Sequence, residues 1–459
     1  MTRISAPCRT PLFVFACLPL LANTACSAEG DDAAEYGTAS ADSAATEGGG
    51  DGDGGDGDGG DGDGDGGDSD GDGGGSGGSG DSGGTSDSGS GDGGTSGSGD
   101  GDGDGDGDGD ITEPGQLTAG EWRDLEHWTF WRSLFDGVDA AWTSMEDEWG
   151  IYTAGRYPVM VVTDNLPVAD ADVVLRGPAN EIVWRARTDA HGEAELFANL
   201  FTNQLGGVDT MLGDEDLQIE VTSAGSTVVL ENPIPAGTDA NIITLDDAAS
   251  PNNILDLMFV IDTTGSMGDE LNYLQTELAD VISQVHAETD PSLLIRVSVN
   301  FYRDQGDAYV VRDFPFTDPS TAMAQLSAQS YGGGGDFPEA LDLALSNGVF
   351  DHEWSPSAAS RLLFLVADAP PHIEEAVPTL HEAVVAAAQR GIRIIPVAAS
   401  GVDKSTEFLM RMTDVSTGGT YIFLTNDSGI GGSHIEPTTG PFQVEPLNEL
   451  LIRVIKQSL

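Results

Sequence analysis

A long stretch without apolar residues sets the strongest limit on what this 459-residue chain can fold into. From Gly48 to Asp110 the sequence is almost entirely Gly, Asp and Ser. Since it has no apolar side chains to bury, it cannot offset the entropy lost on ordering, and we predict a disordered acidic tether over residues 27–116. A Gly-rich coil of about 85 residues has an r.m.s. span of about 50 Å. Calcium-bound Asp-Gly turns are an alternative, but the stretch lacks the regular hydrophobic position that a calcium-binding solenoid needs.

The charge of the chain is strongly negative and unevenly spread. No Lys or Arg lies between Arg9 and Arg123, and residues 29–110 carry 25 acidic residues. Residues 113–459 hold 16 basic and 53 acidic residues, which gives a net charge of −37. Such a surface repels phosphate, which argues against nucleic acid as a partner and is compatible with cations or basic proteins.

The first 26 residues are typical of an export signal. Arg3 and Arg9 precede a short apolar run, Pro11 to Leu21, which is too short to cross a bilayer. All three cysteines lie in this segment, so the exported domains have no internal disulfide. Leu21-Ala22-Asn23-Thr24-Ala25-Cys26 resembles the cleavage site of a bacterial lipoprotein, with Asn at the third position where that family prefers Leu. The resemblance implies lipidation of Cys26 and anchoring in the cell envelope, at the outer membrane or cell surface; an ordinary secreted protein is the alternative.

Residues 117–247 contain enough apolar residues to fold. Thr118-Ala119-Gly120-Glu121 fits a capping box, and the aromatic residues that follow near helical spacing predict a helix. The five tryptophans from Trp122 to Trp149 suggest either an aromatic helix that packs on the sandwich as its core or a sugar-stacking surface. Short alternating segments then predict a small antiparallel β-sandwich. These segments are Val159–Thr163, Ala171–Leu175, Ile182–Ala186, Glu193–Phe197, Leu217–Val221 and Ser226–Leu230.

Two motifs in this region resemble the carboxypeptidase-regulatory-like, prealbumin-type sandwiches. They are Pro167-Val168-Ala169-Asp170-Ala171-Asp172-Val173 and Thr188-Asp189-Ala190-His191-Gly192-Glu193-Ala194. The resemblance implies a spacer module of the kind found in exported bacterial proteins.

Residues 252–459 alternate apolar strands with amphipathic helices. This alternation predicts an α/β fold with a doubly wound, mostly parallel sheet. The expected strands are Leu257–Ile261, Ile295–Phe301, Tyr309–Phe314, Leu362–Ala367, Ile392–Ala399 and Tyr421–Thr425. The expected helices are one with an apolar face from Leu271 to Val285, followed by Ala322–Ala328, Pro338–Leu345, Val377–Gln389, Thr406–Met412 and Leu447–Gln457.

Polar residues follow two of the expected strands. Asp262, Thr264 and Ser266 lie on the turn after the first strand, and Asp368 directly follows the fourth. Ligands of doubly wound sheets bind beyond the carboxyl ends of the strands, so these side chains should share one rim. All four offer oxygen ligands, as hard cations require, and we predict a site for Mg²⁺, with Ca²⁺ or Mn²⁺ as alternatives.

The two motifs together resemble a von Willebrand factor type A (VWA) domain. They are Asp-x-Thr-x-Ser after a buried strand and, about 100 residues later, Ala367-Asp368-Ala369-Pro370-Pro371-His372. The resemblance covers roughly 200 residues and implies a metal-ion-dependent adhesion site (MIDAS), with Asp262, Thr264, Ser266 and Asp368 contacting the ion directly or through water. It also implies a partner protein whose acidic side chain can complete the coordination. N-capping of the next helix is the alternative role, above all for Ser266.

The loop between the two motifs departs from the usual family pattern, which supplies a further Thr. Tyr331-Gly332-Gly333-Gly334-Gly335-Asp336-Phe337-Pro338-Glu339-Ala340 stands there and resembles the loop of the hemicentin-like and alpha-kinase-like members. Asp336 is the candidate replacement ligand or, alternatively, the cap of a helix that begins at Pro338. A third carboxylate would make the ion less attractive to an acidic partner.

Three further residues near this rim are candidates for a supporting role or for contact with the partner. Arg303 and Asp304 end a strand that should run parallel to the first one, so they should reach the same rim; a solvated loop is the alternative. Asp269 lies at the start of the helix after the metal turn, where a negative charge favours the helix dipole.

The sequence gives little support for catalysis. His381-Glu382 lacks the second His of a zinc-protease helix, and no nucleophile, base and orienting group occur together. We therefore expect a non-enzymatic, metal-dependent binding protein with an adhesion-like role. The alternatives are an envelope accessory factor that positions a partner enzyme or complex, and a structural VWA domain with a degenerate metal site.

Overall fold

The structure is a computed structural model that describes residues 113–137, 140–201, 217–237 and 240–459. The predicted export signal, Cys26 and the tether up to residue 112 lie outside the described residues. Within the described part of the chain, no helix is long and apolar enough to cross a membrane.

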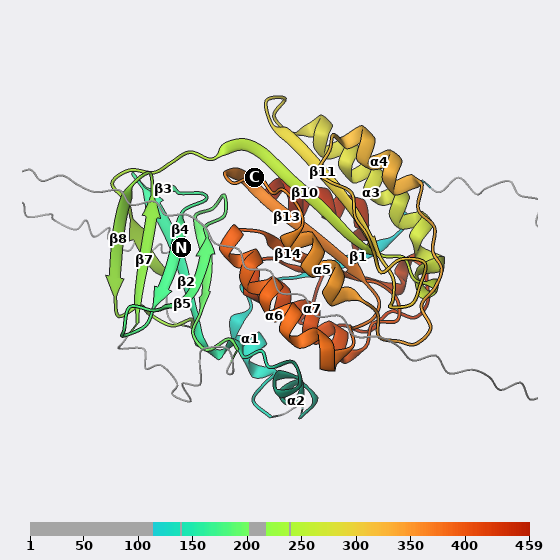
Figure 1. Ribbon diagram of the computed structural model, residues 1–459, viewed down its shortest axis with the longest axis horizontal. Coiled ribbons are helices and arrows are strands. Elements are labelled where there is room, and N and C mark those ends of the chain that lie inside the picture. The colour runs from blue at the N-terminus through green and yellow to red at the C-terminus, as the bar shows by residue number, and fades with distance from the viewer. Residues whose placement is uncertain (1–112, 138–139, 202–216, 238–239) are drawn as a thin grey trace, which may run out of the picture. The chain divides into compact units, whose positions relative to one another are not determined.

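An eight-stranded sheet lies at the centre of the C-terminal region (Figure 1). Its strand order is β12-β11-β10-β13-β14-β15-β1-β16. The five strands from β11 to β15 in this order are parallel, whereas β12 and β1 run against their neighbours. The strands are β1 (Thr118–Trp122), β10 (Asn252–Asp262), β11 (Leu294–Tyr302), β12 (Val311–Arg312), β13 (Ala358–Ala367), β14 (Arg393–Ala398), β15 (Tyr421–Leu424) and β16 (Glu445–Pro446).

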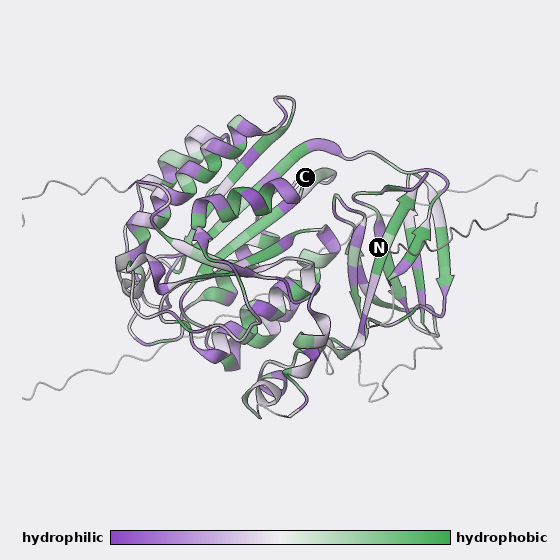
Figure 2. Cartoon of the chain, turned by 180° about the vertical axis from the view of Figure 1, so that it is seen from behind, coloured by the Kyte–Doolittle hydropathy of each residue, from purple (hydrophilic) through white to green (hydrophobic). Residues whose placement is uncertain are grey.

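Helices cover both faces of this sheet. The helices α3 (Gly268–Glu288), α4 (Pro319–Ser327) and α8 (Leu447–Gln457) pack on one face, and α5 (Leu341–Phe350), α6 (Ile373–Arg390) and α7 (Lys404–Thr417) pack on the other (Figure 1). Side chains alternate along β10. Leu257 and Phe259 therefore join the core beneath α3, α4 and α8, and Met258 and Val260 join the core beneath α5, α6 and α7. Figure 2 shows hydrophobic residues along the central strands, as a sheet covered on both faces requires.

The predicted α/β fold with a mostly parallel sheet is confirmed. One predicted helix boundary is wrong, because α5 begins at Leu341 rather than at Pro338. The backbone N–H of Glu339 donates to the carbonyl oxygen of Pro370 at 2.9 Å, which holds the preceding residues in a loop.

The predicted helix start at Thr118 is also wrong, because Thr118–Trp122 forms strand β1. It pairs antiparallel with β15, from Ala119 opposite Leu424 to Trp122 opposite Tyr421. A Cβ on Gly120 would lie 2.6 Å from the ring of Phe423, so the close packing of the two strands requires glycine there. Sheet pairing with a partner about 300 residues away thus overrides the local capping signal.

Two short helices follow β1 and carry the tryptophan cluster. They are α1 (Trp128–Ser133) and α2 (Ala140–Trp149). Trp131, Trp142 and Trp149 are fully buried, and Trp142 packs on Phe408 of α7 with ring centroids 5.7 Å apart. These three tryptophans therefore belong to a core and offer no face to a sugar, but Trp142 packs on α7 of the large domain rather than on the sandwich.

The predicted sandwich consists of two four-stranded sheets. One has the order β5-β4-β7-β8, and the other contains β3-β2-β6 with β9 beside β2. The predicted antiparallel pairing holds except for β9, which pairs parallel with β2. The strands of the two sandwich sheets are β2 (Arg156–Thr163), β3 (Leu166–Pro167), β4 (Asp172–Arg176), β5 (Ile182–Arg187), β6 (Glu193–Phe197), β7 (Gln218–Ser223), β8 (Ser226–Glu231) and β9 (Asn241–Thr244).

Candidate metal centre

The carboxylates predicted from the two strand ends meet at the carboxyl edge of the large sheet. Strands β10 and β13 are parallel neighbours, with Ile261 opposite Val366. Asp262 and Asp368 therefore leave adjacent strands at the same edge. The strand order, which places β10 beside β13, accounts for this meeting of residues about 100 positions apart.

The turn after β10 orients the first three candidate ligands. Both the backbone N–H and the hydroxyl of Thr264 donate to Oδ1 of Asp262 at 2.7 Å. The hydroxyl oxygens of Thr264 and Ser266 lie 3.0 Å apart. Oδ2 of Asp262 and Oδ1 of Asp368 are buried and have no hydrogen-bond partner among the described residues. The turn thus leaves one free oxygen on each carboxylate beside two hydroxyl groups.

Burial disfavours the ionised form of both carboxyl groups as long as no cation is bound. Asp262 is fully buried, and Asp368 is 3% exposed. Burial, reinforced by the charge of Asp368, raises the pKa of Asp262 to about 8, and burial also raises the pKa of Asp368. A bound cation would supply the missing charge and favour the ionised carboxylates.

The Gly-rich loop before α5 is hydrogen-bonded to the metal turn. The N–H of Gly332 donates to the carbonyl oxygen of Thr263 at 3.0 Å, and the N–H of Gly265 donates to that of Gly333 at 3.1 Å. Gly332, Gly333 and Gly334 have φ values of 149°, 84° and 72°, a region that favours glycine. The run of glycines therefore lets the loop backbone lie directly against the turn.

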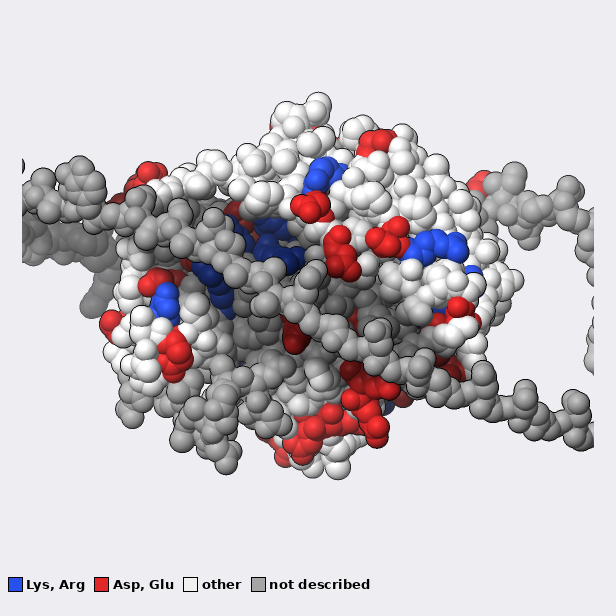
Figure 3. Space-filling view, viewed as in Figure 1, with Lys and Arg blue, Asp and Glu red and all other residues white. Residues whose placement is uncertain are grey.

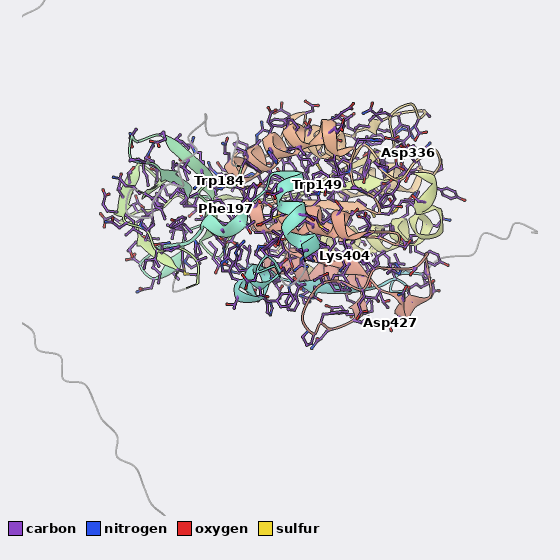
Figure 4. All side chains as sticks on the ribbon, turned by 90° about the horizontal axis from the view of Figure 1, so that it is seen from below. Trp149, Trp184, Phe197, Asp336, Lys404 and Asp427 are labelled. Carbon is purple, nitrogen blue, oxygen red and sulfur yellow. The ribbon has the colours of Figure 1, made fainter. Side chains whose placement is uncertain are left out.

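This loop brings Glu339 toward the metal turn and leaves Asp336 exposed. Glu339 is 3% exposed, and its Oε2 has no hydrogen-bond partner in the part of the chain that the structure describes. A Cβ on Gly334 would lie 2.9 Å from Oε1 of Glu339 and 3.4 Å from Cβ of Thr264, so the two side chains meet beside this glycine. Figure 4 shows Asp336 at the end of the large domain that is remote from the sandwich.

The charge environment of Glu339 agrees with that placement. Burial, followed by the charges of Asp262, Asp304 and Asp368, raises the pKa of Glu339 to about 9. The sequence contained this residue in the quoted loop motif, but nothing in the pattern distinguished it from Asp336. Only the loop conformation decides which carboxylate is turned inward.

The three other residues predicted near this rim, Arg303, Asp304 and Asp269, have different surroundings from one another. Arg303 donates to the carbonyl oxygen of Ser330 at 2.7 Å and lies over the ring of Tyr309, so it supports the Gly-rich loop. Asp304 is 7% exposed, and its Oδ1 lies 3.1 Å from Nε2 of His372. Asp269 lies in the first turn of α3, and its side chain is outside the described part of the structure.

Sequence reasoning also missed Asp307. Its Oδ2 accepts the N–H of Gly334 at 2.8 Å, and a Cβ on Gly333 would lie 2.2 Å from this oxygen. The carboxylate of Asp307 thus packs directly against Gly333 and leaves no room for a Cβ there. Its position in a polar loop gave no signal of this role, because the N–H of Gly334 lies 27 residues further along the chain.

Helix capping does not account for the predicted ligands. The N-cap position of α3 is Met267, and that of α5 is Ala340, and neither helix start has a side-chain cap. The alternative roles of Ser266 and Asp336 as helix caps are therefore wrong.

The donor set fits a hard divalent cation. In the described part of the chain, no three His, Cys, Asp or Glu side chains surround a common point. The donors are mixed instead, with a free buried oxygen on each of Asp262 and Asp368 beside the hydroxyl groups of Thr264 and Ser266. Carboxylate and hydroxyl oxygens are hard ligands, and the uncompensated charge calls for a cation.

Comparisons with solved structures give distant similarities. Two structures of proximal thread matrix protein 1 from the mussel byssus match at 11% and 13% sequence identity, with TM-scores of 0.30 and 0.32. Each match covers 45% of this chain, and 44% and 46% of those chains. Similarity at these values supports no conclusion about the fold or function of this chain. The chain thus spans less than half the length of either relative.

A search of curated proteins finds no match. Residues 256–432 match the family model described as the von Willebrand factor type A domain. This range begins in β10 and includes the metal turn, the Gly-rich loop and Asp368. The sequence motifs, the mostly parallel sheet and this match agree, and the chain contains a VWA domain.

Proposed function

We propose that the protein is a non-enzymatic, metal-dependent binding protein with an adhesion-like role. VWA domains commonly mediate protein–protein interactions. The observation that carries the proposal is the pair of buried carboxylates, Asp262 and Asp368, each with an unpartnered oxygen at the carboxyl edge of the sheet. Burying two such groups is costly unless a cation or proton neutralises them.

In this proposal Asp262, Thr264, Ser266 and Asp368 hold a divalent ion in a MIDAS-type site. Mg²⁺ is the expected ion, and Ca²⁺ or Mn²⁺ would also suit oxygen ligands. The bound ion supplies a positive centre that an acidic side chain of a partner protein can complete.

Glu339 is a neighbouring carboxylate of this site rather than a ligand, because no three carboxylates of the described residues could hold one ion together. Its burial and its unpartnered Oε2 support this assignment. A third carboxylate near the ion lowers the positive potential there, so we expect weaker attraction for an acidic partner than at a site with two carboxylates.

Metal titration tests this assignment. Isothermal titration of the full-length chain with MgCl₂ or MnCl₂ should show one site, which Asp262→Ala abolishes. Glu339→Gln should change the affinity by about tenfold or more, whereas Asp336→Asn should leave it unchanged. Asp336→Asn is the matched control, because it removes the same charge from the same loop. If Asp336→Asn changed the affinity and Glu339→Gln did not, Asp336 rather than Glu339 would be the third carboxylate. Equal metal affinity of Asp262→Ala and the parent protein would contradict the site itself.

The cellular setting in this proposal follows from the predicted N-terminal signal. Acylation of Cys26 would anchor the protein, and the acidic tether would carry its domains away from the membrane. The prealbumin-type resemblance of the sandwich and the hemicentin-like resemblance of the loop fit an exported spacer and binding module.

Protease added to intact cells distinguishes an adhesin from an accessory factor inside the envelope. An adhesin at the surface should be cut, whereas a factor that positions an internal enzyme or complex should be protected. A pull-down from cell-envelope extract with magnesium or chelator then tests metal dependence. Equal recovery with magnesium, with chelator and with Asp262→Ala would favour the structural VWA domain.

A further inference from the structure

A groove lies beside the candidate metal centre. It encloses about 550 Å³ and is lined by the β11–β12 loop, the residue before Glu339 and the start of α6. The wall nearest the metal residues includes Pro370, whose carbonyl oxygen accepts the N–H of Glu339 at 2.9 Å. The groove therefore shares a peptide segment with the metal centre. Its volume lies within the range typical of ligand-binding pockets.

The walls of the groove combine rigid apolar surface with negative charge. Pro338, Pro370 and Pro371 supply apolar surface and have no N–H groups to satisfy. Three carboxylates, those of Asp304, Glu374 and Glu375, also line the groove. Among these described lining residues there is no Lys or Arg, and the single histidine is hydrogen-bonded to Asp304.

The charge around the groove is also negative. The buried Glu339 directly follows the lining residue Pro338, and the buried Asp368 precedes the lining residue Pro370 by two positions. A separate gathering of acidic side chains lies along the lower edge of the face in Figure 3, where Figure 1 draws α2. Glu374 and Glu375 are exposed in the first turn of α6, and neither has a basic partner among the described ion pairs. Their heads are therefore available to an incoming cation.

Three other cavities of the described structure have basic residues in their lining. One of about 560 Å³ lies between α3 and α8, and its Arg453 and Lys456 already pair with Glu445 and Glu288. Two cavities of about 230 and 390 Å³ lie between the sandwich strand β6 and the β14 region of the sheet. Their arginines already form ion pairs, Arg156 with Glu195 at 2.6 Å and Arg393 with Asp189 at 3.6 Å.

We propose that the groove receives a Lys or Arg side chain of the partner protein, next to the metal-bound contact. The inference rests on the proposed function, because it takes the metal-bearing face as the docking face. The aliphatic stem would pack on the prolines and Ile373, and the charged head would reach Glu374, Glu375 or Asp304. The partner class is thus a protein with an exposed basic segment, in agreement with the net charge of −60 of this chain.

A random dodecapeptide phage library is a suitable probe. The library is first depleted on immobilised full-length Glu374→Gln/Glu375→Gln protein and then selected on the parent protein with MgCl₂. Depletion removes peptides that bind the acidic tether, because both proteins carry it. We expect the recovered peptides to be enriched in Lys and Arg by at least threefold over the starting library. Recovery of no binders, or of peptides without this enrichment, would overturn the inference.

A recovered peptide, made synthetically, then tests the site by fluorescence anisotropy. Glu374→Gln/Glu375→Gln should weaken binding by about tenfold, and Asp351→Asn/Glu353→Gln should not. The control pair removes two exposed charges from the connection between α5 and β13, which precedes the strand, whereas the groove lies beyond the strand's carboxyl end. Equal loss in both variants would mean non-specific attraction and contradict the groove.

The same peptide separates failure of the groove from failure of the metal. Binding that survives chelation and Asp262→Ala but is lost in Glu374→Gln/Glu375→Gln would retain the groove and contradict metal dependence. Binding that needs magnesium but is unchanged in Glu374→Gln/Glu375→Gln would retain metal dependence and contradict the groove.

Discussion

At the residue scale, the most demanding feature away from the metal centre is a fully buried arginine. Arg411 of α7 donates to both carboxylate oxygens of Asp124 at 2.6 and 2.8 Å and to Glu407 at 3.1 Å. Its guanidinium lies 5.0 Å from the ring centroids of Trp131 and Trp142. A buried charge is tolerable only with such a complete set of partners. Asp124 follows β1, so this network fixes the N-terminal segment to α7.

We predict that Asp124→Ala lowers the free energy of unfolding by about 3–5 kcal/mol, because it leaves Arg411 buried without its main partner. Urea denaturation followed by circular dichroism measures this. The control is Asp172→Ala, whose partner Arg185 is 43% exposed and whose loss should cost about 1 kcal/mol or less. Similar losses for both substitutions would show that the buried network does not hold the segment.

At the element scale, the Gly-rich loop depends on backbone conformation more than on side chains. We predict that Gly333→Ala destabilises the protein by about 1–3 kcal/mol and weakens magnesium binding, because its φ is 84° and its Cβ would meet the carboxylate of Asp307. Gly335→Ala is the control, since its Cβ would meet nothing within 4 Å. Urea denaturation and magnesium titration measure both effects. Equal behaviour of the two variants would mean that the loop adapts freely.

Strand β1 belongs to the large sheet but precedes the sandwich in the sequence, whereas the other strands of this sheet follow the sandwich. Its residues pair with both β15 and β16, and the backbone N–H groups of Gly115, Gln116 and Leu117 all donate to the buried carboxylate of Glu277 in α3. The family match begins at residue 256 and therefore leaves this strand out.

We predict that a fragment of residues 252–459 is much less stable than one of residues 113–459. Without β1, the edges of β15 and β16 and the carboxylate of Glu277 lose their partners. Thermal and urea unfolding of the two fragments tests this, and the shorter one should lack a cooperative transition. The same transition midpoint in both fragments would contradict a structural role for β1.

At the scale of the whole molecule, the sandwich region and the VWA domain share a buried histidine. Nε2 of His381 in α6 lies 2.8 Å from the carbonyl oxygen of Trp149, and the ring stacks on Phe201 at 4.0 Å. Burial lowers the pKa of His381 from its ordinary value of 6.5. The folded protein therefore keeps this residue neutral at a pH where the unfolded chain takes up a proton.

We predict that the contribution of His381 to stability is present above pH 6.5 and is lost as the pH falls below it. Compared with the parent, His381→Gln should show a weaker decline of unfolding free energy between pH 7 and 5. Urea denaturation with chelator present measures the difference while other titrating groups cancel. The exposed His286→Gln is the control. A parent-like pH dependence for His381→Gln would exclude this residue as the cause.

Much of the large domain could be predicted because its signals are local. Continuous apolar runs mark strands buried on both faces, and the side chains that follow β10 and β13 must emerge at one edge once the strands are parallel. The exposed Asp336 and the buried Glu339 could not be distinguished in this way, because both belong to one short loop whose fold depends on hydrogen bonds to the metal turn.

The sequence by itself determined the α/β architecture and the positions of Asp262, Thr264, Ser266 and Asp368, because hydrophobic periodicity and chain order are sufficient for both. The tertiary structure alone decided that Thr118–Trp122 is a strand and that Glu339 faces the site. Both outcomes depend on contacts between distant segments. Pairing with β15 outweighs a local helix signal, and the positive φ angles of the glycine loop turn one carboxylate inward and leave the other in solvent.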